Sequence, residues 1–214
     1  MRAISKGLEP IELLQYRAQP GAIYDGNNFT TLKNRIRETL LSEQDHLCAY
    51  CMQRITADSM KVEHWHSQTG YPGEHLAYGN MLGCCPGNEG SPSRDQHCDT
   101  LKADSDISCN PADLTHEPRM RIRYAGDGTI RSDNVQFDVE INTILNLNWV
   151  RLKNNRQSVW KAVTQVLSIN QGSRTRGEVQ SLIDRWNLRD ADGCLKEYCA
   201  VAIYYLEKKL RKLG

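Results

Sequence analysis

The sequence contains no long apolar run. Its first residues, Met1 to Gly7, lack the apolar core of roughly 7–15 residues that defines a secretory signal peptide. No segment approaches the roughly 20 consecutive apolar residues that a membrane-spanning helix needs. We therefore expect a cytoplasmic protein with no membrane partner. Internal repeats and low-complexity tracts are lacking as well.

The sequence also has almost no net charge. The 214 residues include 27 lysines and arginines and 26 acidic residues, a formal net charge of +1. A protein that holds nucleic acid through its overall charge would carry a strong positive excess. Any contact with nucleic acid is therefore expected to come from a local basic patch or from a partner protein.

The rest of the composition is typical of a folded protein. Apolar residues make up 39% and charged residues 25% of the chain, whose length allows one large or two small domains. The pattern predicts an α+β fold. We expect a helical lead at 1–45, a cysteine-containing module at 46–118, and a hairpin followed by a mainly helical domain at 119–214. The polar stretch 103–118 is the predicted linker.

Apolar residues recur at helical spacing in several segments. They predict helices over 10–16 and 29–41, a short helix over 94–103, and further helices after Phe137. The last of these is expected to begin near Leu195.

Eight cysteines carry most of the chemical information. In a reducing compartment they are metal ligands or buried apolar side chains more often than disulfides. Cys48 and Cys51 are spaced so that one backbone turn can fill two corners of a zinc tetrahedron. The second pair would be drawn from Cys84 or Cys85 and Cys98, with His97 as an alternative ligand. Cys109, Cys194 and Cys199 lack such spacing and are expected in the core.

An acidic residue and two histidines lie between the cysteine pairs. Glu63 and His64 belong to a predicted short strand at 61–65. Histidine titrates near neutral pH without help, which suits a general base. On a regular strand His64 and His66 would point to the same face, so either could be that base. Trp65 between them is expected to face the core.

The order of these residues resembles the HNH, or ββα-metal, nucleases. The resemblance rests on the two cysteine pairs, on the acidic-His pair and on Asn80. Further motifs resemble one subfamily, the PtuB-like nuclease subunit of Septu-type and retron-linked anti-phage systems. These motifs are Lys6-Gly7-x-x-Pro10, Cys48-Ala-Tyr-Cys51, Asn146-Leu147-Asn148 and Asn155-Arg156. The second resemblance covers most of the chain to about residue 156.

The resemblance implies catalytic roles. His64 would be the general base, favoured over His66 by the order of the motif, and Asn80 would hold the loop and orient the base. The fold implied is a zinc-stapled ββα-metal module at 46–118. Its reaction would be the hydrolysis of a phosphodiester bond by an activated water.

The resemblance also implies two metal sites. A structural zinc would take Cys85 in preference to Cys84, because the family places its third cysteine five residues after the motif Asn. Twelve residues, Pro86 to His97, lie between Cys85 and Cys98, whereas the family has two residues between the members of this pair. Glu63 would bind a catalytic Mg²⁺ or another divalent ion. The third motif position is Asp99, where the family usually has Asn or His, and His97 is the alternative second ligand.

Basic residues near the motif are candidates for nucleic-acid binding. Lys102, at the end of the motif, could reach a phosphate, although a solvated lysine is equally consistent. Arg119, Arg121 and Arg123 alternate with apolar residues ahead of the Gly-Asp-Gly turn at 126–128, which predicts a β-hairpin with arginines on one face. Such a row can hold a phosphate backbone, yet solvated charged faces are just as common.

As a whole, the resemblance implies an endonuclease acting on DNA or on a structured RNA such as tRNA, in bacterial anti-phage defence. Its implied partners are a PtuA-like ATPase and a retron reverse transcriptase with its DNA–RNA hybrid. One alternative is a zinc ribbon that only binds nucleic acid or protein, but a ribbon needs neither Glu63-His64 nor Asn80. The other alternative is a restriction or homing HNH nuclease outside defence.

Overall fold

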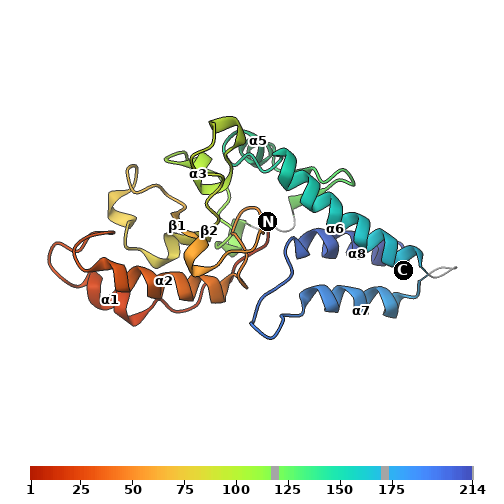
Figure 1. The fold of residues 1–214 in the computed structure, drawn as a ribbon, viewed down its shortest axis with the longest axis horizontal. Helices are drawn as coiled ribbons and strands as arrows, with labels where there is room; N and C mark the ends of the chain where they lie inside the picture. Colours follow the sequence, from red (N-terminus) through yellow and green to blue (C-terminus); the bar gives the residue numbers. More distant parts are fainter. Residues whose placement is uncertain (117–120, 170–173, 214) are drawn as a thin grey trace.

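The computed structural model describes residues 1–116, 121–169 and 174–213, which form a mixed α and β protein. A body holds two antiparallel strand pairs and several helices, and an arm of three helices extends from it (Figure 1). The body contains α1 (Ile11–Arg17), α2 (Phe29–Glu43), β1 (Lys61–His64), β2 (Met81–Cys84), α3 (Cys98–Lys102), β3 (Ile122–Tyr124), β4 (Ile130–Ser132) and α5 (Val135–Thr143). The arm consists of α6 (Val150–Ser168), α7 (Arg176–Asn187) and α8 (Cys199–Arg211).

The two N-terminal helices form where the sequence predicts them. α1 begins directly after Pro10, whose fixed φ suits the start of a helix. α2 buries one face, because its apolar residues recur every three or four positions. The residues of that face are Phe29, Leu32, Ile36, Leu40 and Leu41. α2 packs against both α1 and β2.

β1 and β2 form the strand pair that carries the motif. They run antiparallel, with Glu63 opposite Leu82 and His64 opposite Met81. α3 follows β2 in the chain, so the element order around the motif is strand, strand, helix.

α3 is shorter than the helix predicted over 94–103. Only a 3₁₀ turn forms at Ser93–Asp95, and the α-helix begins at Cys98. His97 between them is extended, and its N–H donates to the Gly87 carbonyl at 3.0 Å. This long-range bond takes the chain out of helical geometry, which a local pattern cannot reveal.

The predicted hairpin after residue 120 is confirmed. β3 and β4 pair antiparallel across the turn at 126–128. The apolar residues of β3 are buried, whereas Arg121 and Arg123 are exposed. Arg119, the third arginine of the predicted row, lies outside the described residues.

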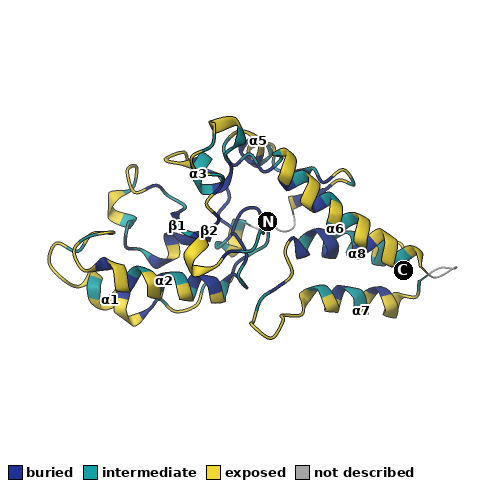
Figure 2. Cartoon of the chain, viewed as in Figure 1, coloured by how far each residue is buried: buried dark blue, intermediate teal, exposed yellow. Residues whose placement is uncertain are grey.

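One apolar core runs through the body, and Figure 2 shows its buried segments in dark blue. Phe137 and Ile141 of α5 belong to the same core as the cysteine-containing segment. The described part of the predicted linker, 103–116, contributes buried Ile107 and Cys109. That stretch is therefore packed into the body and does not connect independent units. The domain boundaries at 45 and 118 stay predictions.

A second core joins the helices of the arm. Its buried residues are Val163, Val179, Ile183, Leu195, Cys199, Ala202, Ile203 and Leu206, together with Leu47 of the body. The last helix begins at Cys199, so Leu195 lies in the preceding loop and not in the helix predicted there. None of the helices described here is long and apolar enough to cross a membrane.

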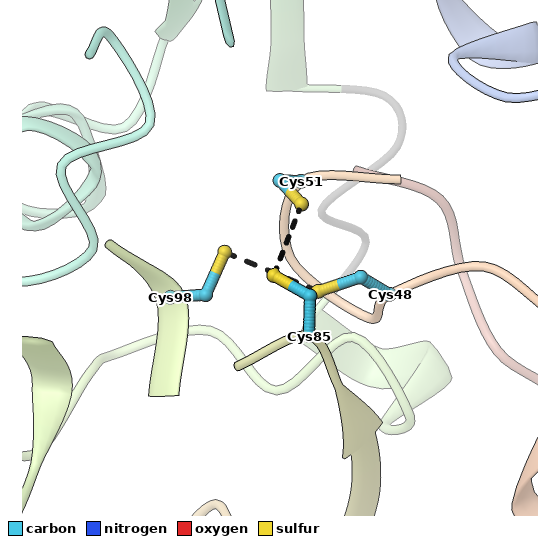
Figure 3. Close-up of side chains that lie close together, drawn as sticks. All are labelled: Cys48, Cys51, Cys85 and Cys98. Atoms are coloured by element: carbon cyan, nitrogen blue, oxygen red, sulfur yellow. Dashed lines mark hydrogen bonds between the residues drawn. The ribbon is translucent and has the colours of Figure 1, made fainter. Parts of the chain in front are cut away.

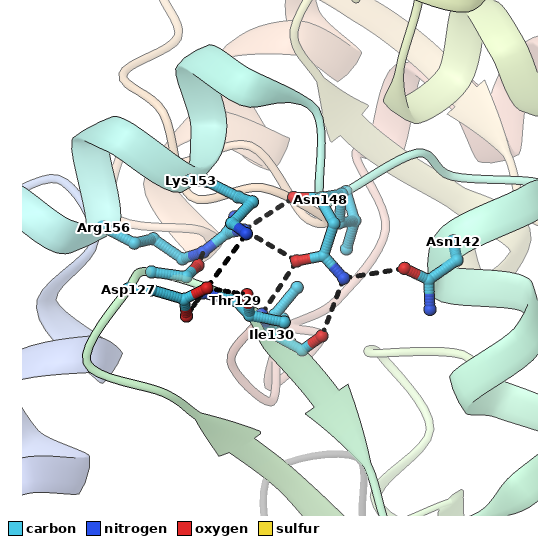
Figure 4. A network of polar contacts seen from close by, with 9 residues as sticks. Asp127, Thr129, Ile130, Asn142, Asn148, Lys153 and Arg156 are labelled. Atoms are coloured by element: carbon cyan, nitrogen blue, oxygen red, sulfur yellow. Dashed lines mark hydrogen bonds and ion pairs between the residues drawn. The ribbon is translucent and has the colours of Figure 1, made fainter.

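Arg156 fixes the base of the arm to the body. Its buried guanidinium donates to the carbonyl oxygens of Gly128 at 2.6 Å and Leu147 at 2.7 Å, and to Asn148 Oδ1 at 3.2 Å (Figure 4). A Cβ at Gly128, whose φ is +83°, would overlap the carbonyl oxygen of Lys153. The hairpin turn can therefore approach α6 this closely only with glycine at that position.

Replacing Arg156 by Met is expected to lower the free energy of unfolding by about 2–4 kcal/mol, because two buried carbonyls lose their donor. Methionine keeps most of the apolar contact, so the loss reports on the hydrogen bonds. Urea denaturation of the full chain measures it. Lys153→Met is the control, since it removes only the partly exposed ion pair with Asp127 and should cost under about 1 kcal/mol. Equal losses in both variants would contradict the anchoring role.

Candidate active site and metal centre

Four cysteine sulfurs gather in one place in the body (Figure 3). The Sγ atoms of Cys48, Cys51, Cys85 and Cys98 all lie within 4.8 Å of one another, and all four residues are buried. The Cys51–Cys85 sulfurs are 3.7 Å apart and the Cys48–Cys98 sulfurs 3.9 Å. Zn–S bonds of about 2.3 Å in a tetrahedron would place sulfurs roughly 3.8 Å apart. The cluster therefore fits a structural zinc ion.

Backbone hydrogen bonds shape the turn that carries the first two cysteines. The Cys48 N–H donates to the Gln53 carbonyl at 2.8 Å, and the Met52 N–H donates to the Cys48 carbonyl at 3.1 Å. Met52 adopts a φ of +67°, and this left-handed residue closes the turn. The Ala49 N–H donates to the Gly83 carbonyl at 3.0 Å, which holds the turn against β2.

The four thiols need a cation in order to ionise together. Burial raises the pKa of Cys51 and of Cys98 well above the ordinary value. At Cys48 burial acts in the same direction, but hydrogen bonds from the neighbouring thiols outweigh it and lower the pKa. Because zinc binds thiolates, metal binding would release protons, and its affinity would rise with pH.

The structure distinguishes between the two cysteines that the sequence offered as the third ligand. Cys85 joins the cluster, whereas Cys84 is buried in β2 outside the set of four. Cys109 and Cys199 are buried elsewhere in the cores, as predicted. Cys194 is only half-buried, so the expectation of a core position is wrong for that residue.

His97 lies with the cysteines. Its Nδ1 is 3.2 Å from the Cys98 sulfur and 4.0 Å from the Cys85 sulfur, and its ring lies 5.3 Å from that of Trp149. No contact in the described part of the chain joins His97 to Glu63. The structure therefore argues against His97 as the second ligand of a catalytic ion.

Glu63 is the centre of a polar cluster. The Tyr50 hydroxyl donates to Glu63 Oε1 at 2.9 Å, and Lys102 Nζ lies 3.0 Å from the same oxygen. Burial raises the pKa of Glu63 well above its ordinary value, and a hydrogen bond with Asp99 and the charge of Asp99 raise it further. Lys61 Nζ lies 3.6 Å from the Asp99 carboxylate. Two carboxylates thus lie close together, each with an ammonium group beside it.

His64, at the end of β1, is held in one tautomer. Its Nε2 lies 3.0 Å from the carbonyl oxygen of His75, and because a carbonyl can only accept, Nε2 carries the hydrogen. No hydrogen bond from the described residues reaches Nδ1, which keeps its lone pair. Burial lowers the pKa of His64 below 6.5, so the ring is neutral at neutral pH. The ring also meets Tyr24 edge-on, with centroids 4.6 Å apart, and a neutral imidazole oriented in this way can act as a general base.

Asn80 holds the loop that follows β1. Its Oδ1 accepts a hydrogen bond from the His66 N–H at 2.8 Å, and its Nδ2 donates to the His66 carbonyl at 2.9 Å. Both bonds are made to the backbone, so Asn80 fixes the direction in which the chain leaves His64. This geometry agrees with the loop-holding role that the resemblance implies for Asn80.

His66 has different surroundings from His64. β1 ends at His64, so strand alternation does not continue to His66, and the two histidines do not share a face as expected. The His66 ring stacks between Trp65 and Tyr71, with centroids 4.1 Å from each, and its Nδ1 bonds to Glu74 at 2.8 Å. Trp65 packs partly against the core, in line with the prediction.

Lys102 does not face solvent. It is fully buried, with Nζ beside Glu63 and 3.2 Å from the His64 carbonyl oxygen. The predicted phosphate contact of Lys102 therefore disagrees with the structure. Arg121 and Arg123 are exposed on the hairpin, where Arg123 pairs with Asp133 at 2.7 Å, and their contact with nucleic acid stays a prediction.

Sequence reasoning missed two residues of the polar cluster. Tyr50 lies inside the Cys-Ala-Tyr-Cys turn, and nothing in that spacing indicates a hydroxyl directed at Glu63. Lys61 precedes Glu63 by two residues in β1, so strand alternation places both side chains on one face. That periodicity is a signal from which Lys61 could have been found.

Glu63 and Asp99 fit part of a site for a hard divalent ion. Mg²⁺ prefers carboxylate oxygens, and it often binds a protein through one or two carboxylates while water and substrate phosphate complete its shell. Within the described ranges, the four cysteines are the one group of three or more ligating side chains close enough to hold an ion. A divalent ion at Glu63 and Asp99 would therefore depend on such outside ligands.

Comparison with known proteins agrees with this chemistry. The chain is 28% identical over 133 residues to a protein of Escherichia coli named "Retron Ec83 putative HNH endonuclease". The match covers 57% of this chain and 49% of that protein, so the chain spans about half the length of its relative. No family model matches the chain. Similarity to a protein with this name supports a nuclease function.

Proposed function

We propose that this protein is an HNH-type endonuclease that hydrolyses phosphodiester bonds with a divalent cation. The observation that carries the proposal is the geometry of His64, a buried imidazole whose Nε2–H is bonded to the His75 carbonyl and whose pKa is lowered by burial. The strand–strand–helix order around these residues supports it, as does the similarity to a protein named as an HNH endonuclease.

In the proposed reaction His64 Nδ1 takes a proton from the water that attacks phosphorus. The Nε2–H bond to the His75 carbonyl keeps the ring in place and stabilises the imidazolium that forms. Glu63 and Asp99 would hold the divalent ion, which supplies Lewis-acid stabilisation of the charge that develops on the phosphate. Asn80 keeps the loop after β1 in position.

The zinc in this proposal is structural. Cys98 is the first residue of α3, and Asp99 follows it directly. A metal bound to four cysteines would tie α3 to β2 and to the turn at residues 48–51. It would thereby fix Asp99 relative to Glu63 without touching the substrate.

We further propose a role in anti-phage defence with an ATPase partner. The Septu-like motifs and the retron in the name of the relative support this role. The partner would be a PtuA-like ATPase, with a retron reverse transcriptase and its DNA–RNA hybrid as a further component. The substrate would be DNA or a structured RNA such as tRNA.

A cleavage assay on plasmid DNA and on tRNA, with and without Mg²⁺, tests the proposal. We expect weak, divalent-dependent cleavage by the isolated chain. A PtuA-like ATPase should form a complex with the chain and change the cleavage rate according to the nucleotide that the ATPase binds. Strong cleavage by the chain alone, unaffected by the ATPase, would contradict the proposed ATPase partner and support the nuclease function. Binding without cleavage under every condition would favour the zinc-ribbon alternative.

A further inference from the structure

The small net charge of the chain conceals a strong separation of charge. Residues 151–214 contain 13 lysines and arginines and 6 acidic residues, a net charge of +7. Residues 1–150 contain 14 lysines and arginines and 20 acidic residues, a net charge of −6. This division follows the architecture. The basic part, residues 151–214, begins one residue into α6 and makes up the arm, and the acidic part, residues 1–150, makes up the body.

Most cations of the arm are available to a partner. Arg156 is buried, and Lys153, Arg174 and Arg189 are held in ion pairs. The other cations of the arm have no ion pair within the described residues: Arg151, Lys161, Arg176, Arg185, Lys196, Lys208, Lys209, Arg211 and Lys212. Figure 2 shows that the outward sides of the arm helices are exposed.

The unpaired cations are densest at the distal tip, which we define as residues 174–178 and 207–213. The end of α8 supplies Lys208, Lys209, Arg211 and Lys212 to this tip, and the start of α7 supplies Arg176. The acidic residues of the described tip are Glu178, which is bonded to Arg174 and Thr175, and Glu207. The end of α8 and the start of α7 both lie at the end of the molecule away from β1 and β2 (Figure 1).

We propose that the distal tip binds the phosphate backbone of the nucleic acid that the candidate active site acts on. This inference rests on the proposed nuclease function, and it names where the substrate is held. The acidic body would repel a polyanion, so attraction has to come from the arm. Clustered, flexible lysines and arginines without ion partners suit contacts to phosphate, which release counterions and require no base sequence.

The position of the tip also limits the size of the substrate. α6 has 19 residues, which at about 1.5 Å per residue gives the arm a length of roughly 28 Å. A nucleic acid that touches both the tip and the body must span at least this length. At about 3.4 Å per base pair this corresponds to roughly eight base pairs. The tip therefore favours a duplex or a folded RNA over a very short oligonucleotide.

Binding assays on the full chain test the proposal. The tip variant carries Lys208→Gln, Lys209→Gln, Arg211→Gln and Lys212→Gln. The control variant carries Arg17→Gln, Arg35→Gln, Arg94→Gln and Arg131→Gln, which lie on the body, away from the candidate nucleic-acid contacts Arg121 and Arg123, with side chains 39%, 55%, 85% and 68% exposed. Both variants lose four positive charges. Affinity for fluorescent duplexes of about 30 and about 6 base pairs, and for a tRNA, is measured without added divalent cation so that nothing is cut.

The tip variant should bind the long duplex and the tRNA about 10²-fold more weakly than the wild type, and its salt dependence should fall by roughly 0.9 per lost phosphate contact. The control variant should stay within about threefold. The advantage of the long duplex over the short one should disappear in the tip variant. Zinc content and circular dichroism of both variants verify that the fold is intact.

Equal loss in the tip and control variants would overturn the proposal, because only net charge would then matter. The proposal would also be overturned if the tip variant bound nucleic acid as tightly as the wild type. The same holds if the tip variant lost its binding to the ATPase but kept its affinity for nucleic acid. These outcomes are independent of cleavage. If the wild type binds nucleic acid through its tip but never cuts it, the proposed nuclease function is rejected and the proposed binding surface is supported. If the wild type cuts nucleic acid and the tip variant binds it normally, the binding surface is rejected and the nuclease function is supported.

Discussion

Replacing Cys48 by Ser is expected to remove the zinc and unfold the body around β1, β2 and α3. A structural zinc bound by cysteines contributes about 10–16 kcal/mol of apparent binding free energy, which is as large as the whole stability of an ordinary domain. Cys48 is almost fully buried in the core, so loss of the metal would leave uncompensated polar thiols inside it. Metal analysis should find about one zinc per wild-type chain and none in the variant, with a loss of cooperative thermal unfolding.

Two serine variants serve as controls. Cys194→Ser changes a half-buried thiol in a loop of the arm and should leave zinc content and melting unchanged. Cys84→Ser lies next to the site but outside the four ligands, so it should keep the zinc and lose only a little stability. Full zinc content and normal melting in Cys48→Ser would refute the site. If Cys84→Ser lost the zinc and Cys85→Ser kept it, Cys84 would replace Cys85 as the third ligand.

The variant His64→Ala is expected to lose nuclease activity by about 10²- to 10⁴-fold, the usual contribution of a general base. It should keep its zinc, because His64 is not among the four ligands. Some stability should be lost as well, since the ring is buried against Tyr24 and bonded to the His75 carbonyl. His64→Gln retains a polar side chain of similar length and should lose the same activity with a smaller change in melting.

His66→Ala separates the two histidines. Its ring is stacked between Trp65 and Tyr71 and bonded to Glu74, outside the Glu63–Asp99 cluster, so activity should fall by less than about tenfold. A dead His66→Ala together with an active His64→Ala would reverse the assignment. The pH profile is a second check: because burial lowers the pKa of His64, the loss of rate on acidification should occur below pH 6.5.

Local patterns were enough for the parts of this protein that depend on neighbours in the chain. The apolar spacing of α2, the alternation in β3 and the turn at 126–128 each follow from the side chains of a few consecutive residues. The candidate ligands Cys48 and Cys51 were equally accessible, because two thiols in one turn need no distant contact.

Long-range packing decided the rest. The sequence could not exclude His97 from the catalytic cluster, because the position of His97 depends on its hydrogen bond to Gly87, which delays the start of the predicted helix to Cys98. Lys102 was expected at the surface, since a lysine is rarely buried fully. Its pairing with Glu63, 39 positions earlier in the chain, and its hydrogen bond to the His64 carbonyl offset the cost of removing its charge from water.

The charge separation depends on both the sequence and the tertiary structure. The sequence by itself determined it, since the counts of basic and acidic residues on either side of residue 150 are fixed by composition. Only the tertiary structure decided that many of these cations have no ion pair with another described residue, and that most of the unpaired ones lie at one tip. The helices turn their apolar sides into a shared core, which leaves the lysines and arginines of α7 and α8 on the outside, at the end far from the acidic body. Folding thereby places on one surface charges that composition alone averages to nearly zero.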